Sequence, residues 1–205
     1  MEKLTDEFGG LNASDLQHLI LDNKYIKECY SNKKKDKSSL SSLIDIPLSQ
    51  SESIKLGIGI EDILRELISK YSNLKNIKPK NKKGNKERDH LFCDEKNKKI
   101  YYAELKANIN LDTEKSKITS LKCLQIVEEL NEQYSDYEIN WCLVAYRYIN
   151  FTDIPTTIKN KYNNISKNLY GINQYLSMLG INLVFDEKTY KSFLNDIAHA
   201  MFNNS

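Results

Sequence analysis

The chain has 205 residues, of which 40% are hydrophobic and 28% charged, and its formal net charge is +2. This length and apolar content favour one domain with a substantial core. The net charge is too small to indicate by itself a nucleic-acid-binding protein. The sequence has no run approaching the roughly 20 apolar residues of a membrane span and no recognisable signal peptide, so we expect a cytoplasmic protein.

The four cysteines are scattered along the chain and form no C-x-x-C pair. They are Cys29, Cys93, Cys123 and Cys142. This spacing favours buried thiols in a reducing compartment over disulfides or a zinc site.

The first 50 residues contain one predicted helix. Asn12–Asp15 supplies capping residues for a helix that continues to about Tyr30. A second, stronger helix is predicted from Ser51 to Lys70, with apolar residues at helical spacing. Its Gly57-x-Gly59 permits close approach of another backbone or of a ligand such as DNA.

A short strand at Asn73–Ile77 and a basic segment follow. Seven of the residues between Lys75 and Arg88 are basic, among them Lys83 and Lys86. Such a run is either a solvated loop or a segment that contacts phosphates, and both interpretations stay open.

Residues 87–107 predict a β-hairpin, with two apolar-rich runs around the polar turn 94–99. Alternation places Tyr102, Glu104 and Lys106 on one face of the second strand. If the strands pair, Asp89 of the first strand lies beside Glu104 and Lys106.

Two neighbouring carboxylates and an ammonium suit one kind of chemistry. Mg²⁺ binds through one or two carboxylates and keeps several waters. A bound metal ion lowers the pKa of water and offsets charge on a phosphoryl oxygen, while a lysine can position the attacking water. The hairpin therefore suits metal-assisted hydrolysis of a phosphodiester.

The rest of the chain alternates helices and strands. The predicted elements are a helix capped by Asp112 or Thr113 and reaching about Tyr134, a buried strand over 138–149, a helix over 153–168, a helix over 170–179 ended by Gly180, a strand over 181–185, and a last helix capped by Asp186. Trp141 is predicted to belong to the core, and His90 to be structural because it points away from Asp89.

Asp89, the turn after it and Glu104-Leu105-Lys106 resemble the motif of the PD-(D/E)XK nuclease superfamily, and within it the type II restriction endonucleases. The chain departs from the motif at Arg88, where the family usually has proline. The resemblance implies an α/β fold whose central mixed sheet is flanked by helices, with a core over residues 51–205 and a helical extension over residues 1–50 for DNA wrapping or dimer contact. It also implies that Asp89 and Glu104 hold the metal and that Lys106 activates water.

The resemblance extends to further site residues. The family's first core helix often carries a glutamate at the metal site, and Glu61 matches it. The alternatives are that Glu61 is an exposed partner of Arg65, or that Glu66 completes the site. The DNA-contact candidates are Asn108, Asn110, Thr113, Lys115, Lys117, Lys83 and Lys86.

The expected function is a Mg²⁺-dependent endonuclease, with Mn²⁺ as a substitute, that cuts double-stranded DNA at a short sequence as a homodimer. A cognate methyltransferase is implied genetically rather than as a physical partner. Two alternatives remain: a repair or junction-resolving nuclease, and a non-catalytic DNA-binding subunit. No P-loop, dinucleotide fingerprint or nucleophile elbow is present in the sequence.

Overall fold

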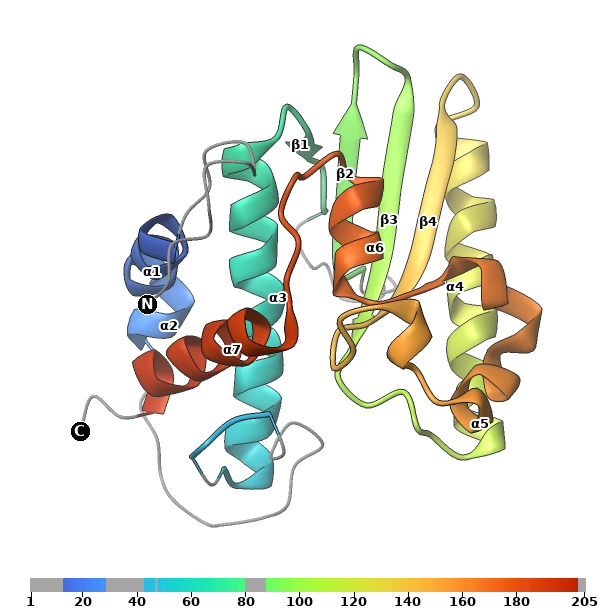
Figure 1. The fold of residues 1–205 in the computed structure, drawn as a ribbon. Coiled ribbons are helices and arrows are strands. Elements are labelled where there is room, and N and C mark those ends of the chain that lie inside the picture. Colours follow the sequence, from blue (N-terminus) through green and yellow to red (C-terminus); the bar gives the residue numbers. More distant parts are fainter. Residues whose placement is uncertain (1–12, 29–42, 47, 80–87, 203–205) are drawn as a thin grey trace. The chain divides into compact units, whose positions relative to one another are not determined.

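The structure, a computed structural model, describes residues 13–28, 43–46, 48–79 and 88–202 (Figure 1). The chain divides into two compact units, one formed by residues 1–71 with 180–205 and the other by residues 72–179. The expected extension over residues 1–50 and core over residues 51–205 stay a prediction.

The first unit is helical. Its helices are α1 (Ala13–Asp22), α2 (Lys24–Glu28), α3 (Gln50–Tyr71) and α7 (Glu187–Phe202). The expectation of one continuous helix from residue 12 to about residue 30 was wrong, because Asn23 interrupts it. The Asn23 Oδ1 accepts a hydrogen bond from the Ile26 amide at 3.1 Å, and its Nδ2 donates to Asp62 and Glu66 of α3, each at 2.9 Å.

The helix α3 begins at Gln50, one residue before its predicted start. Ser49 and Glu52 form a capping box at this end. The Ser49 hydroxyl accepts from the Glu52 amide at 3.2 Å, and the Glu52 carboxylate accepts from the Ser49 amide at 2.7 Å. A Cβ at Gly59 would lie 2.7 Å from the Met201 Sδ, so the close approach that this glycine permits is made by α7. Ile54 is one of the apolar residues at helical spacing in this helix, but it is 62% exposed.

The second unit is built on a mixed sheet. Its strands are β1 (Lys75–Asn76), β2 (His90–Asp94), β3 (Lys99–Lys106), β4 (Glu138–Ala145) and β5 (Leu169–Tyr170). They are ordered β1-β2-β3-β4-β5, with the β1/β2 and β2/β3 pairs antiparallel and the β3/β4 and β4/β5 pairs parallel. The expected α/β class and mixed sheet are confirmed, as is the hairpin of β2 and β3.

Helices cover the two faces of this sheet (Figure 1). The long α4 (Thr113–Gln133) packs through Cys123, Ile126 and Leu130 on the face that carries Leu91 and Tyr102. The short α6 (Ile172–Met178) packs on the opposite face, where its Tyr175 hydroxyl lies 2.6 Å from the buried His90 Nδ1. The predicted structural role of His90 is confirmed.

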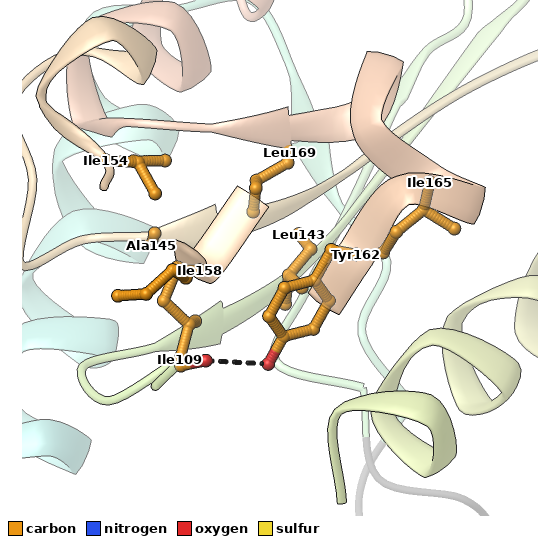
Figure 2. Packing of buried hydrophobic residues seen from close by; sticks show 8 residues of the cluster. All are labelled: Ile109, Leu143, Ala145, Ile154, Ile158, Tyr162, Ile165 and Leu169. Atoms are coloured by element: carbon orange, nitrogen blue, oxygen red, sulfur yellow. Dashed lines mark hydrogen bonds between the residues drawn. The ribbon is translucent and has the colours of Figure 1, made fainter. Parts of the chain in front are cut away.

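The segment expected to form one helix over 153–168 is broken. It contains the 3₁₀ turn η1 (Phe151–Asp153), the helix α5 (Thr156–Lys159) and the irregular 3₁₀ segment η2 (Asn160–Asn168). Within η2 the backbone leaves helical geometry at Tyr162 and Ile165. Both side chains enter a core cluster against Leu143 of β4, and the Tyr162 hydroxyl donates to the Ile109 carbonyl at 3.0 Å (Figure 2). The backbone therefore leaves helical geometry at the two residues whose side chains pack into the core.

Residues 181–185 do not form the predicted strand. Ile181, Leu183 and Phe185 are buried and alternate with exposed residues, so the two-residue period in the sequence was real. The segment nevertheless pairs with no strand in the described part of the chain. Asp186 caps α7 as predicted, because its Oδ1 accepts from the Thr189 amide at 2.7 Å.

No helix in the described ranges is both long enough and apolar enough to cross a bilayer. The described cysteines, Cys93, Cys123 and Cys142, are buried free thiols, as the spacing predicted, and Cys29 lies outside the described residues.

Candidate active site

The β2/β3 hairpin brings the predicted acids together. Its register pairs His90 with Ala103 and Leu91 with Tyr102, which sets Asp89, directly before β2, level with Glu104. The Asp89 Oδ2 accepts a hydrogen bond from the Leu105 amide at 2.8 Å. This bond crosses the hairpin and holds the Asp89 carboxylate against β3.

Lys106 lies between the two carboxylates. Its Nζ is 2.9 Å from the Glu104 Oε1 and 4.0 Å from the Asp89 Oδ2. Asp89, Glu104 and Lys106, which the sequence predicted to lie together, do so: both carboxylates lie near the Lys106 ammonium.

A fourth residue, Lys122 of α4, completes the cluster and was not predicted from the sequence. Its Nζ donates to the Glu104 Oε1 at 2.8 Å and to the Oε2 at 2.9 Å. The Tyr102 hydroxyl also donates to the Oε2, at 3.3 Å. Glu104 thus accepts hydrogen bonds at both oxygens from its own strand and from the helix that follows.

The cluster is largely removed from solvent. Glu104 is 1% exposed and Asp89 is 7% exposed, whereas the side chains of Lys106 and Lys122 are 37% and 32% exposed. Two carboxylates and two ammonium groups balance in formal charge. This balance satisfies the general requirement that a buried charge be paired and hydrogen-bonded.

The two acids differ in their pKa. Burial and the neighbouring Glu104 raise the pKa of Asp89, and Lys106, the Leu105 amide and Lys122 only partly offset them. Burial also opposes ionisation of Glu104, but the charges of Lys106 and Lys122 and their hydrogen bonds outweigh it and lower its pKa. The pair therefore combines one stable carboxylate with one whose negative charge is poorly compensated.

This donor set fits a hard divalent cation. Both carboxylates face the position of a positive charge, which the Lys106 ammonium supplies, and oxygen ligands are those that Mg²⁺ prefers. Within the described residues, no group of three or more His, Cys, Asp and Glu side chains gathers as a metal site. A cation here would take Asp89 and Glu104 as protein ligands and fill its other positions with water or substrate oxygens.

No family model, curated protein or solved structure matches the chain. The site must therefore be interpreted from its own geometry.

Arg88, at the position where the resembled family usually has proline, is tied to α4. Its Nη2 lies 3.2 Å from the Glu129 Oε2, and the Arg88 side chain is only 14% exposed. The ion pair therefore tethers the residue that precedes Asp89 to α4.

The predicted role of Glu61 is not tested by this geometry. Glu61 is a half-buried residue of α3, in the first unit, whereas Asp89 and Glu104 belong to the second. Its neighbour Arg65 pairs with Asp62, and Glu66 accepts from Asn23. These contacts show that Glu66 helps to join α3 to the break between α1 and α2.

The DNA-contact candidates after β3 lie on the loop into α4 and on its first turns. Asn108, Asn110, Thr113, Lys115 and Lys117 are all exposed. The Asn110 Oδ1 accepts from Lys161, and Lys115 pairs with Asp112, which caps α4. Lys83 and Lys86 lie outside the described residues.

Lys122 was missed because the face of α4 that meets the sheet includes small polar residues, while some of its apolar residues are exposed. Leu121 and Leu124 are 50% and 36% exposed, whereas the small residues Ser116 and Ser120 are fully buried. The helical spacing of the small residues Ser116, Ser120 and Cys123 could have predicted the buried face of α4. Lys122 lies at the border of that face.

Proposed function

We propose that this protein is a Mg²⁺-dependent nuclease of the PD-(D/E)XK type that hydrolyses phosphodiester bonds in double-stranded DNA. The observation that carries the proposal is the convergence of Asp89 and Glu104 on the Lys106 ammonium, at 4.0 and 2.9 Å. Hydrolysis of a phosphodiester requires charge stabilisation and an oriented water, and these groups supply both.

Each residue has a role in the proposed reaction. Asp89 and Glu104 would hold the divalent ion, which when bound would lower the pKa of water and offset charge on the phosphoryl oxygens. Lys106 donates a hydrogen bond that orients the attacking water in line with the leaving oxygen. The Leu105 amide keeps the Asp89 carboxylate on the side of the hairpin that carries Glu104.

The path of the chain supports DNA binding at the same edge of the sheet. Because β3 and β4 are parallel and α4 connects them, α4 begins near the end of β3 that carries Lys106. The positive end of the helix dipole and the exposed Lys115 and Lys117 then attract backbone phosphates. Thr113, Asn108 and Asn110 are the polar residues available there for further contacts.

Within this activity we favour a type II restriction enzyme with a restriction-endonuclease-like core that acts in the cytoplasm as a homodimer, with Mn²⁺ as a substitute metal. Two-fold symmetry allows two identical sites to cut both strands of a palindrome. A methyltransferase of the same specificity would protect the host DNA.

The decisive experiment incubates the protein with plasmid DNA and Mg²⁺ and sequences the ends. Discrete fragments with one shared end sequence are expected, and cleavage restricted to branched DNA would instead identify a junction-resolving nuclease. Glu104→Ala should abolish cleavage while DNA binding is retained, because a negative charge near phosphate is removed. Glu95→Gln, in the exposed hairpin turn, is the matched control and should cleave normally. Full activity of Glu104→Ala would refute the proposal.

A further inference from the structure

Lys122 holds the carboxylate that the proposed function assigns to the metal. Its ammonium contacts both Glu104 oxygens, at 2.8 and 2.9 Å, and the Lys106 ammonium lies 2.9 Å from the Oε1. A cation that binds Glu104 directly needs an oxygen lone pair that points towards it. In the structure Lys122 is the side chain that reaches over both oxygens from another element.

We propose that Lys122 occupies Glu104 while the site is free of metal, releases this carboxylate to the divalent ion, and then binds the substrate phosphate as a second catalytic lysine. This inference rests on the proposed nuclease function. In this proposal Lys122 of α4 contacts the substrate. The metal can bind only when the ion pair between Lys122 and Glu104 is broken.

The charge of the cluster supports this exchange. Asp89, Glu104, Lys106 and Lys122 together carry no formal net charge, so a dication adds two positive charges to a small volume. The ammonium that leaves Glu104 then needs another anion, and a DNA phosphate supplies one. Metal and substrate are thereby coupled, because each favours the rearranged position of Lys122.

Lys122 is better suited to move than Lys106. Lys106 follows Glu104 by two residues on the same strand, and it also lies 4.0 Å from Asp89. Lys122 extends from a helix, carries its ammonium on four flexible carbons, and has a side chain that is 32% exposed. Its head group can turn from the buried carboxylate towards solvent and substrate without a backbone movement.

The first test measures Mn²⁺ affinity of the full chain without DNA, by the loss of the free-ion electron paramagnetic resonance signal. Lys122→Met should bind Mn²⁺ about tenfold or more tightly than the wild type, because no charge-assisted hydrogen bond has to be broken. Lys122→Arg should bind no more tightly than the wild type, since a guanidinium can hold both oxygens of Glu104. Lys96→Met removes the same charge from an exposed position in the hairpin turn and should change the affinity by less than about twofold.

The second test measures single-turnover cleavage of plasmid DNA at saturating Mn²⁺. Lys122→Met should cleave about a hundredfold more slowly than the wild type despite its tighter metal binding, which is the scale for losing one donor to a transition-state oxyanion. Circular dichroism establishes that the variants are folded.

Unchanged or weaker Mn²⁺ affinity in Lys122→Met would overturn the inference, and so would tighter binding with undiminished cleavage. Either result leaves the nuclease assignment intact as long as the wild type cleaves and Glu104→Ala does not. If neither the wild type nor Lys122→Met binds Mn²⁺, the inference and the assignment fail together.

Discussion

Replacing Asp89 by asparagine should stabilise the metal-free protein while it abolishes cleavage. The Asp89 carboxylate is buried beside Glu104, which raises its pKa and makes its ionised form unfavourable in the folded state. An asparagine oxygen can still accept the Leu105 amide at 2.8 Å without the charge. We expect a gain of about 1 kcal/mol at pH 8, the usual size for removing strain at a functional residue, and a rise of about 2–4 °C in melting temperature.

The pH dependence follows from the direction of this shift. Because the folded-state pKa of Asp89 lies above its unfolded value, the folded wild type binds the proton more strongly, and it loses stability as the pH rises through the folded pKa. Asparagine does not titrate, so Asp89→Asn does not lose stability in this way as the pH rises. The stability difference between the variant and the wild type should therefore be largest at neutral pH and above, and should vanish as the pH falls below the ordinary aspartate pKa of 3.8.

The assay is thermal and urea denaturation followed by circular dichroism in the presence of EDTA, from about pH 3 to about pH 8. Asp94→Asn is the control within the same hairpin. Its exposed carboxylate has a lowered pKa because it accepts from Asn97, so its replacement should reduce stability at neutral pH. A less stable Asp89→Asn at pH 8, or a difference independent of pH, would refute the reasoning. Adding Mn²⁺ should stabilise the wild type but not Asp89→Asn.

Three further predictions concern the surroundings of the site. Arg88→Ala should cost less than about 1 kcal/mol in unfolding free energy, because Glu129 is 42% exposed, yet it should slow plasmid cleavage because the tether beside Asp89 is lost; a rate equal to that of the wild type would contradict this. Tyr162→Phe should cost about 1–3 kcal/mol in urea denaturation because the buried Ile109 carbonyl loses its donor; an unchanged midpoint would show that the bond is dispensable. Gly171→Ala should cost more than about 2 kcal/mol, because its Cβ would lie 2.6 Å from a backbone carbonyl oxygen, and an unaltered melting temperature would count against the packing described.

Local patterns predicted much of the candidate site. The two-residue period around a polar turn correctly placed Asp89, Glu104 and Lys106 together, because the side chains of paired strands alternate strictly between faces. Lys122 escaped prediction, because the rotation of α4 about its axis is set by packing on the sheet. The exposed Leu121 illustrates this, since hydrophobicity alone would have turned the opposite face inward.

Breaks in regular structure were the least predictable feature of the fold. Asn23 divides the first helix because its side chain finds partners on α3, far away in the sequence. Tyr162 and Ile165 interrupt the segment after β4 because their side chains enter the core. Residues 181–185 have the burial period of a strand but pair with no strand among the residues that the structure describes.

The sequence by itself determined the hairpin, its two acids and one lysine, and the caps of α4 and α7, since these depend on residues only a few positions apart. Only the tertiary structure decided that Glu104 is held by Lys122, that Arg88 is tied to Glu129, and that the chain divides after Tyr71. Such contacts join residues whose proximity depends on how helices pack on the sheet and on one another, and no local period encodes that choice.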